Sequence, residues 1–154
     1  MTQAELLSEV VETFRYVPRP SLSEIRFHKD ECAHCEMTAK FLAGYTEPAL
    51  PASAIRWLCD ELSSLSAEAT RWLLPSYLRH VLTDPIEMER PIEFLIYNIS
   101  LSPSDELQKR LSGLNDRQVE CLRAVIDFWC RDEHWGDYCS EELERARTVL
   151  ARTR

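Results

Sequence analysis

The sequence predicts an all-α fold, built as a single compact domain of about seven to nine short helices over 1–154. Its 154 residues are 45% hydrophobic, which suffices for one packed core. It has only three glycines, and they do not cluster, so P-loop and dinucleotide-binding folds are excluded. No Asn-Gly or Asp-Gly pair, the strongest hairpin signal, occurs. Apolar residues instead recur at the three- and four-residue spacing of helices.

The first predicted helix begins after Thr2, which forms a capping-box pair with Glu5, and ends before Pro18. Its apolar face comprises Leu6, Leu7, Val10, Val11, Phe14 and Val17. Because a serine and a glutamate stand three residues apart at the start of 21–27, we expect a second, short helical turn there.

Asp30 is the predicted N-cap of the next helix, and Gly44 suits the left-handed position after its end. Pro51 fits the first turn of the following helix. The apolar face of that helix comprises Ile55, Leu58, Cys59 and Leu62. Ser66 caps a further helix, in which Pro75 predicts a break or kink because proline lacks a backbone N–H.

Helices are also predicted for the second half of the chain. The apolar stretch Ile92–Leu101 is short enough to be a strand, but a lone strand has no partner, which favours a helix. Asp105–Ser112 forms a short helix closed by a glycine. Asn115 and Gln118 form another capping-box pair, and Ser140 caps the last helix. In the helix after Asn115, the residues expected to face the core are Val119, Leu122, Val125, Ile126 and Trp129.

The charge balance excludes some classes of partner. Lys and Arg total 18 against 26 Asp and Glu, giving a net charge of -8, which argues against nucleic acid as a partner. No apolar run is long enough for a membrane span. The first residues lack the basic and apolar regions of a signal peptide, so we expect a cytoplasmic protein whose six cysteines are mostly reduced.

A histidine and two cysteines form a candidate metal site. Cys32 and Cys35 are spaced to place two sulfurs on one helix turn, and His28 precedes Cys32 by four residues. These three would be zinc ligands, with His34, a distant cysteine or water as the fourth. Alternatively, the cysteines only pack the start of a helix while His28 makes a local hydrogen bond. Cys59 shares a face with apolar residues and is expected in the core.

A thiol oxidoreductase is a further interpretation of the same Cys-x-x-Cys, because a helix N-terminus stabilises a thiolate. Some all-helical peroxidase-like proteins carry a histidine three residues beyond such a motif. Thr38 stands at that position here, so the proton-relay residue is missing.

The segment 132–144 combines acidic and aromatic residues without any Lys or Arg. Its six acids are Asp132, Glu133, Asp137, Glu141, Glu142 and Glu144. Aromatic anchors surrounded by charge are typical of protein interfaces. The candidate partner-binding residues are Trp135, Asp137, Tyr138, Glu141 and Glu142. Alternatively, Trp129 and Trp135 are core residues and the acids form a solvated face.

Five parts of the sequence carry a family resemblance. They are Pro18-Arg19-Pro20-Ser21; His28 with Glu31-Cys32 and Cys35-Glu36; Leu74-Pro75-Ser76-Tyr77-Leu78; Glu93-Phe94-Leu95-Ile96-Tyr97 with Leu101-Ser102-Pro103; and Leu114-Asn115-Asp116-Arg117-Gln118. Over most of its length the chain thus resembles an uncharacterised family of small bacterial helical proteins, a domain of unknown function. The resemblance implies a helical fold and no known activity.

The leading hypothesis from the sequence is a non-enzymatic protein that binds a basic protein partner. An immunity protein that neutralises a basic bacterial toxin, such as a nuclease, would fit its small size and acidic charge. The alternatives are a small zinc-binding protein with a structural site at the Cys-x-x-Cys and a thiol oxidoreductase.

Overall fold

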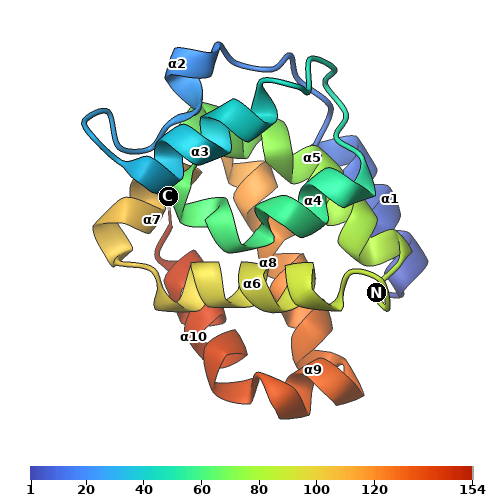
Figure 1. The fold of residues 1–154 in the computed structure, drawn as a ribbon. Coiled ribbons are helices and arrows are strands. Elements are labelled where there is room, and N and C mark those ends of the chain that lie inside the picture. The colour runs from blue at the N-terminus through green and yellow to red at the C-terminus, as the bar shows by residue number, and fades with distance from the viewer. Residues whose placement is uncertain (154) are drawn as a thin grey trace.

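Ten α-helices and one 3₁₀ helix form the regular structure of residues 1–153, the part of the chain that the computed structural model describes (Figure 1). The helices are α1 (Gln3–Thr13), α2 (Leu22–Ile25), α3 (Ala33–Leu42), α4 (Ala52–Leu58), η1 (Cys59–Ser64), α5 (Ala67–Thr83), α6 (Glu89–Leu101), α7 (Ser104–Leu111), α8 (Asp116–Arg131), α9 (Glu133–Tyr138) and α10 (Ser140–Ala151). The all-α prediction is confirmed, with one α-helix more than the predicted range. None of these helices is both long and apolar enough to cross a membrane.

Helix α5 runs through the hydrophobic core, and Figure 1 shows it behind α3 and α4. Every residue from Trp72 to Leu78 is buried, so α5 has no solvent-facing side over this stretch. The hydroxyl of Tyr77 donates a hydrogen bond to the Pro91 carbonyl at 2.6 Å and ties α5 to the start of α6. Around α5, α1 packs against α5 and α8, while α10 packs against α6 and α8.

Of the break or kink predicted at Pro75, the break does not occur: α5 runs without interruption from Ala67 to Thr83. Proline removes one intrahelical donor, yet the residues on both sides of Pro75 are held by burial in the core. The stretch Ile92–Leu101, for which a strand was the alternative, lies within helix α6, as predicted.

Local capping signals predicted several helix starts correctly. The capping boxes at Thr2 and Asn115 are both formed, and the hydroxyl oxygen of Ser66 accepts the N–H of Ala69 at 3.1 Å. The starts near Pro51 and Ser140 are each displaced by one residue: Pro51 is itself the N-cap of α4, and Ser140 is the first residue of α10.

The N-cap predicted for α3 is wrong, whereas Gly44 follows the end of α3 as predicted but in a different conformation. Cys32 is the N-cap in place of Asp30, which lies in the preceding loop, where its carbonyl accepts a bond from Arg26 at 2.8 Å. Gly44 does not adopt the left-handed conformation. The chain instead leaves α3 through short-range bonds, in which the N–H of Gly44 donates to the Phe41 carbonyl at 3.4 Å and the N–H of Tyr45 donates to the Leu42 carbonyl at 3.0 Å. The guanidinium of Arg19 adds bonds to the carbonyls of Leu42 and Ala43, at 3.5 and 3.4 Å.

Candidate metal site at the start of helix α3

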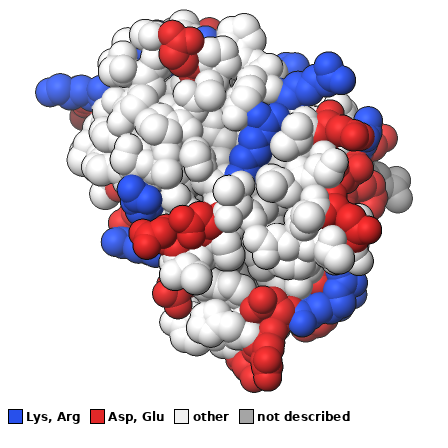
Figure 2. All heavy atoms as spheres, turned by 90° about the vertical axis from the view of Figure 1, so that its right-hand side faces the viewer, with Lys and Arg blue, Asp and Glu red and all other residues white. Residues whose placement is uncertain are grey.

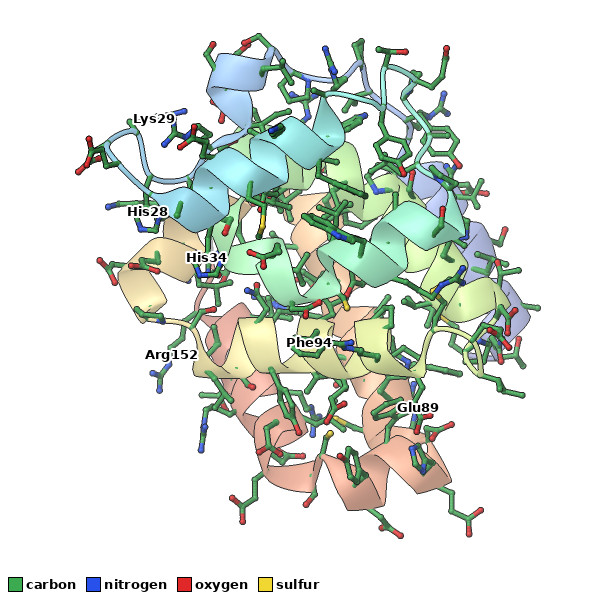
Figure 3. The ribbon with its side chains drawn as sticks, in the orientation of Figure 1. His28, Lys29, His34, Glu89, Phe94 and Arg152 are labelled. Atoms are coloured by element: carbon green, nitrogen blue, oxygen red, sulfur yellow. The ribbon has the colours of Figure 1, made fainter. Side chains whose placement is uncertain are left out.

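The loop between α2 and α3 is fixed to the body of the protein by backbone hydrogen bonds. The N–H of Phe27 donates to the Ser64 carbonyl at 3.0 Å, and the N–H of Ser66 donates to the Ile25 carbonyl at 2.9 Å. The ring of Phe27 meets the neighbouring His28 ring edge-on, with centroids 4.9 Å apart. These contacts place His28 beside the first turn of α3 (Figure 3).

Helix α3 places the two cysteines on its first turn. Its buried residues are Cys35, Thr38, Ala39 and Leu42, which is the pattern of one helical face. Cys32 is the N-cap, and its sulfur accepts the backbone N–H of Cys35 at 3.4 Å. The sulfur of Cys32 is therefore held near that of Cys35, at the end of the helix where the dipole is positive.

His28, Cys32 and Cys35 form a group that could hold a metal ion. Their ligand atoms all lie within 4.8 Å of one another, and Nδ1 of His28 is 3.3 Å from Sγ of Cys35. In a tetrahedral zinc site, the usual bond lengths put a nitrogen and a sulfur ligand about 3.6 Å apart and two sulfurs about 3.8 Å apart. The histidine–cysteine spacing therefore already matches a zinc site to within a few tenths of an ångström. The same contact between His28 and Cys35 is also a local hydrogen bond of the kind expected if the two cysteines only pack the start of the helix.

The two cysteines differ in environment. Cys32 is half-buried and Cys35 is fully buried. The N–H of Cys35, directed at the sulfur of Cys32, is the main cause that lowers the pKa of the Cys32 thiol. Burial raises the pKa of the Cys35 thiol. Cys32 is thus the thiol of the pair that more readily carries negative charge.

The predicted fourth protein ligands lie elsewhere. The His34 side chain is 75% exposed, and its Nδ1 lies 3.5 Å from Oε2 of Glu61 rather than in the group of three. Cys59 lies in the core, as predicted, and burial raises its pKa to about 12. Cys121, Cys130 and Cys139 belong to α8 and the start of α10. Of the predicted choices for the fourth position, only water agrees with this arrangement.

The chain matches no family model, no curated protein and no solved structure.

The second predicted site, in the segment 132–144, is divided by the fold. Trp135 is only 5% exposed and belongs to the hydrophobic core, as does Trp129. Trp135 is thus not a surface anchor for a partner. Asp132 is the N-cap of α9, where its carboxylate accepts the N–H groups of His134 and Trp135 at 3.0 Å each. Asp132 therefore has a structural role as a helix cap, independent of any partner.

The other acidic candidates remain at the surface with Tyr138. Asp137 and Glu141 are exposed, Glu142 is half-buried, and Tyr138 is 60% exposed. Figure 2 shows acidic side chains gathered at the lower end of the molecule, where Figure 1 places α9, with basic side chains beside them. Binding of a basic partner at this surface stays a prediction.

The structure adds neighbours that the sequence did not indicate. Glu61 pairs with His34 from 27 positions away, and the guanidinium of Arg110 lies 5.2 Å from the ring centre of Phe27. Glu93 accepts hydrogen bonds from the hydroxyls of Tyr97 and Tyr138, at 3.0 and 3.1 Å. Except for the Tyr97 bond, these contacts join different elements, so no local spacing could reveal them.

Proposed function

We propose that the protein binds one zinc ion through His28, Cys32 and Cys35, with water as the fourth ligand. The observation that carries the proposal is the convergence of the three ligand atoms within 4.8 Å, with one histidine–cysteine contact at 3.3 Å. Imidazole nitrogen and thiolate sulfur are ligands that zinc prefers, whereas calcium and magnesium prefer oxygen.

Zinc at this position would have a structural effect. His28 comes from the α2–α3 loop, whereas the two sulfurs belong to the first turn of α3. An ion bound by all three would join the loop to the helix. Because such a site requires the folded arrangement, the metal would stabilise the native state.

The three protein ligands also leave one coordination position to solvent. A zinc ion with three protein ligands and a water resembles catalytic zinc sites in its coordination, whereas closed structural sites have four protein ligands. His28 is exposed and Cys32 is half-buried, so solvent reaches the site from the side of the loop.

Zinc titration of the metal-stripped, reduced protein tests the proposal. The readout is competition with a chromogenic chelator, together with the sulfur-to-metal charge-transfer band after cobalt substitution. The test variants are His28→Ala and Cys32→Ser. Their matched controls are His134→Ala, an exposed histidine of α9, and Cys130→Ser, the other half-buried cysteine.

We expect about one zinc per chain for the wild-type protein and both controls. Each test variant should bind zinc at least about tenfold more weakly, and Cys32→Ser should weaken the charge-transfer band. A wild-type stoichiometry below about 0.2 per chain would end the proposal. Equal loss in test and control variants would also contradict it, since binding would then not depend on this group.

A further inference from the structure

We propose that Cys32 and Cys35 form a reversible disulfide, in which Cys32 is the thiol that attacks an oxidant and Cys35 is the thiol that resolves it. The substrate class is a small peroxide, with hydrogen peroxide as the simplest member. The inference concerns the metal-free dithiol and does not require that zinc binds.

The positions of the two cysteines on α3 carry the first part of the argument. Cys32 is the N-cap and Cys35 is the third helical residue, so the pair spans the first turn. Residues three apart on a helix lie on one face, and the two sulfurs here are no more than 4.8 Å apart. A disulfide requires about 2.05 Å. Because Cys32 is half-buried and lies outside the helical residues, its side chain is the one that can rotate to close this distance.

The unequal exposure of the two sulfurs sets the order of the reaction. A peroxide reaches Cys32, which is half-buried, but not Cys35, which has no exposed surface. The backbone N–H of Cys35 donates to the sulfur of Cys32 at 3.4 Å and fixes its position at the start of α3. The difference in exposure favours Cys32 as the first site of oxidation.

The chemistry balances with peroxide as the oxidant. The Cys32 sulfur attacks one oxygen of hydrogen peroxide, an S–O bond forms and the O–O bond breaks. The departing hydroxide takes up the proton of the Cys32 thiol to become water, which leaves Cys32 as a sulfenic acid. The Cys35 sulfur then attacks the sulfur of Cys32. An S–S bond forms, the S–O bond breaks, and the leaving hydroxide combines with the proton of the Cys35 thiol. Two thiols are oxidised by two electrons in total, and one hydrogen peroxide is reduced to two waters.

The disulfide and a metal ion would exclude each other at this site, because each uses both sulfurs. This consequence rests on the proposed zinc site. Zinc-loaded protein is therefore expected to oxidise more slowly than metal-free protein, and oxidation is expected to release the metal. The loss of zinc binding and the formation of the disulfide are measured separately, so failure of one is distinguishable from failure of the other.

The test uses reduced, metal-free protein treated with equimolar hydrogen peroxide, then alkylated and digested with trypsin. Cleavage after Lys29 and Lys40 yields one peptide that contains both cysteines. We expect the mass of this peptide after oxidation to be lower than that of its reduced form by two hydrogen atoms, and treatment with dithiothreitol to restore the reduced mass. Oxidation of Met37, which is in the same peptide, would add an oxygen instead and is separable by mass.

Single variants test the order of attack. Cys35→Ser should leave Cys32 as a sulfenic acid that dimedone traps, whereas Cys32→Ser should slow oxidation of the peptide by at least about tenfold. Cys130→Ser, at a half-buried cysteine on α8, should behave as the wild-type protein does. Equal rates for Cys32→Ser and wild type would overturn the proposal. A disulfide between any other pair of cysteines would overturn it as well.

Discussion

Replacing Trp135 by alanine decides whether this residue is a core residue or a surface anchor. The side chain is 5% exposed and lies in the core cluster. Burial of a tryptophan side chain removes about 150–250 Å² of its surface from water. Each Å² of buried apolar surface stabilises the native state by about 25 cal/mol. After allowance for the methyl group of alanine and for a compact denatured state, the loss is about 3–4 kcal/mol, within the usual range for such truncations. With a urea m-value of about 2 kcal/mol/M, the midpoint should fall by about 1.5–2 M.

The matched control is Tyr138→Ala, three residues along the same short helix. Tyr138 is 60% exposed, and its hydroxyl donates to the carboxylate of Glu93 at 3.1 Å. Its replacement should change the free energy of unfolding by less than about 0.5 kcal/mol. Urea unfolding followed by far-UV circular dichroism measures both variants. If Trp135→Ala unfolds within about 1 kcal/mol of the wild type, the assignment of Trp135 to the core is refuted. If it behaves as expected, loss of partner binding in that variant would report unfolding rather than a lost contact.

Two further predictions concern stability, both measured by urea unfolding. A Cβ at Gly136 would lie 2.8 Å from the Cys130 carbonyl oxygen, whereas one at Gly44 has ordinary contacts. Gly136→Ala should therefore cost about 1–2 kcal/mol despite the better helix propensity of alanine, and Gly44→Ala should be neutral or stabilising by up to about 1 kcal/mol. Shifts of the same sign in both would contradict this. Arg110 is buried, its three guanidinium nitrogens lack hydrogen bonds within residues 1–153, and the nearest contact to Glu106 is 3.8 Å. Arg110→Met should stabilise the protein by about 1–2 kcal/mol, and a clear destabilisation would show that the ion pair outweighs the cost of burial.

Capping boxes formed by residues three positions apart could be predicted from the sequence, whereas contacts with distant residues could not. The capping boxes at Thr2 and Asn115 use residues three positions apart, and both form. At the end of α3, the carbonyls of Leu42 and Ala43 also accept bonds from Arg19, more than twenty residues earlier in the chain, which no local spacing indicates, and Gly44 does not adopt the left-handed conformation. Burial on both sides of Pro75 likewise depends on tertiary packing, and it outweighs the local preference for a break.

The two candidate sites also differ in how far local spacing predicts them. His28, Cys32 and Cys35 lie within eight residues, so the spacing already places their side chains near one another, and the structure brings them together. A run of acids and aromatics is different, because spacing does not show which aromatic ring is turned inward. Trp135 faces the core, while Tyr138 faces solvent.

The acidic segment is therefore not one uniform patch, and each acid has to be considered with its neighbours. Asp132 caps α9, and Glu144 pairs with Arg147 at 3.0 Å. Helix α6 adds Glu93, which is far from the segment in sequence but bonds to Tyr138. A basic partner at this surface would thus meet Glu93 of α6 as well as acids of the segment 132–144, which spans α9 and the start of α10. Because α6 contributes, a variant confined to residues 132–144 would leave part of that negative charge in place, and a test of the surface requires a change at Glu93 as well.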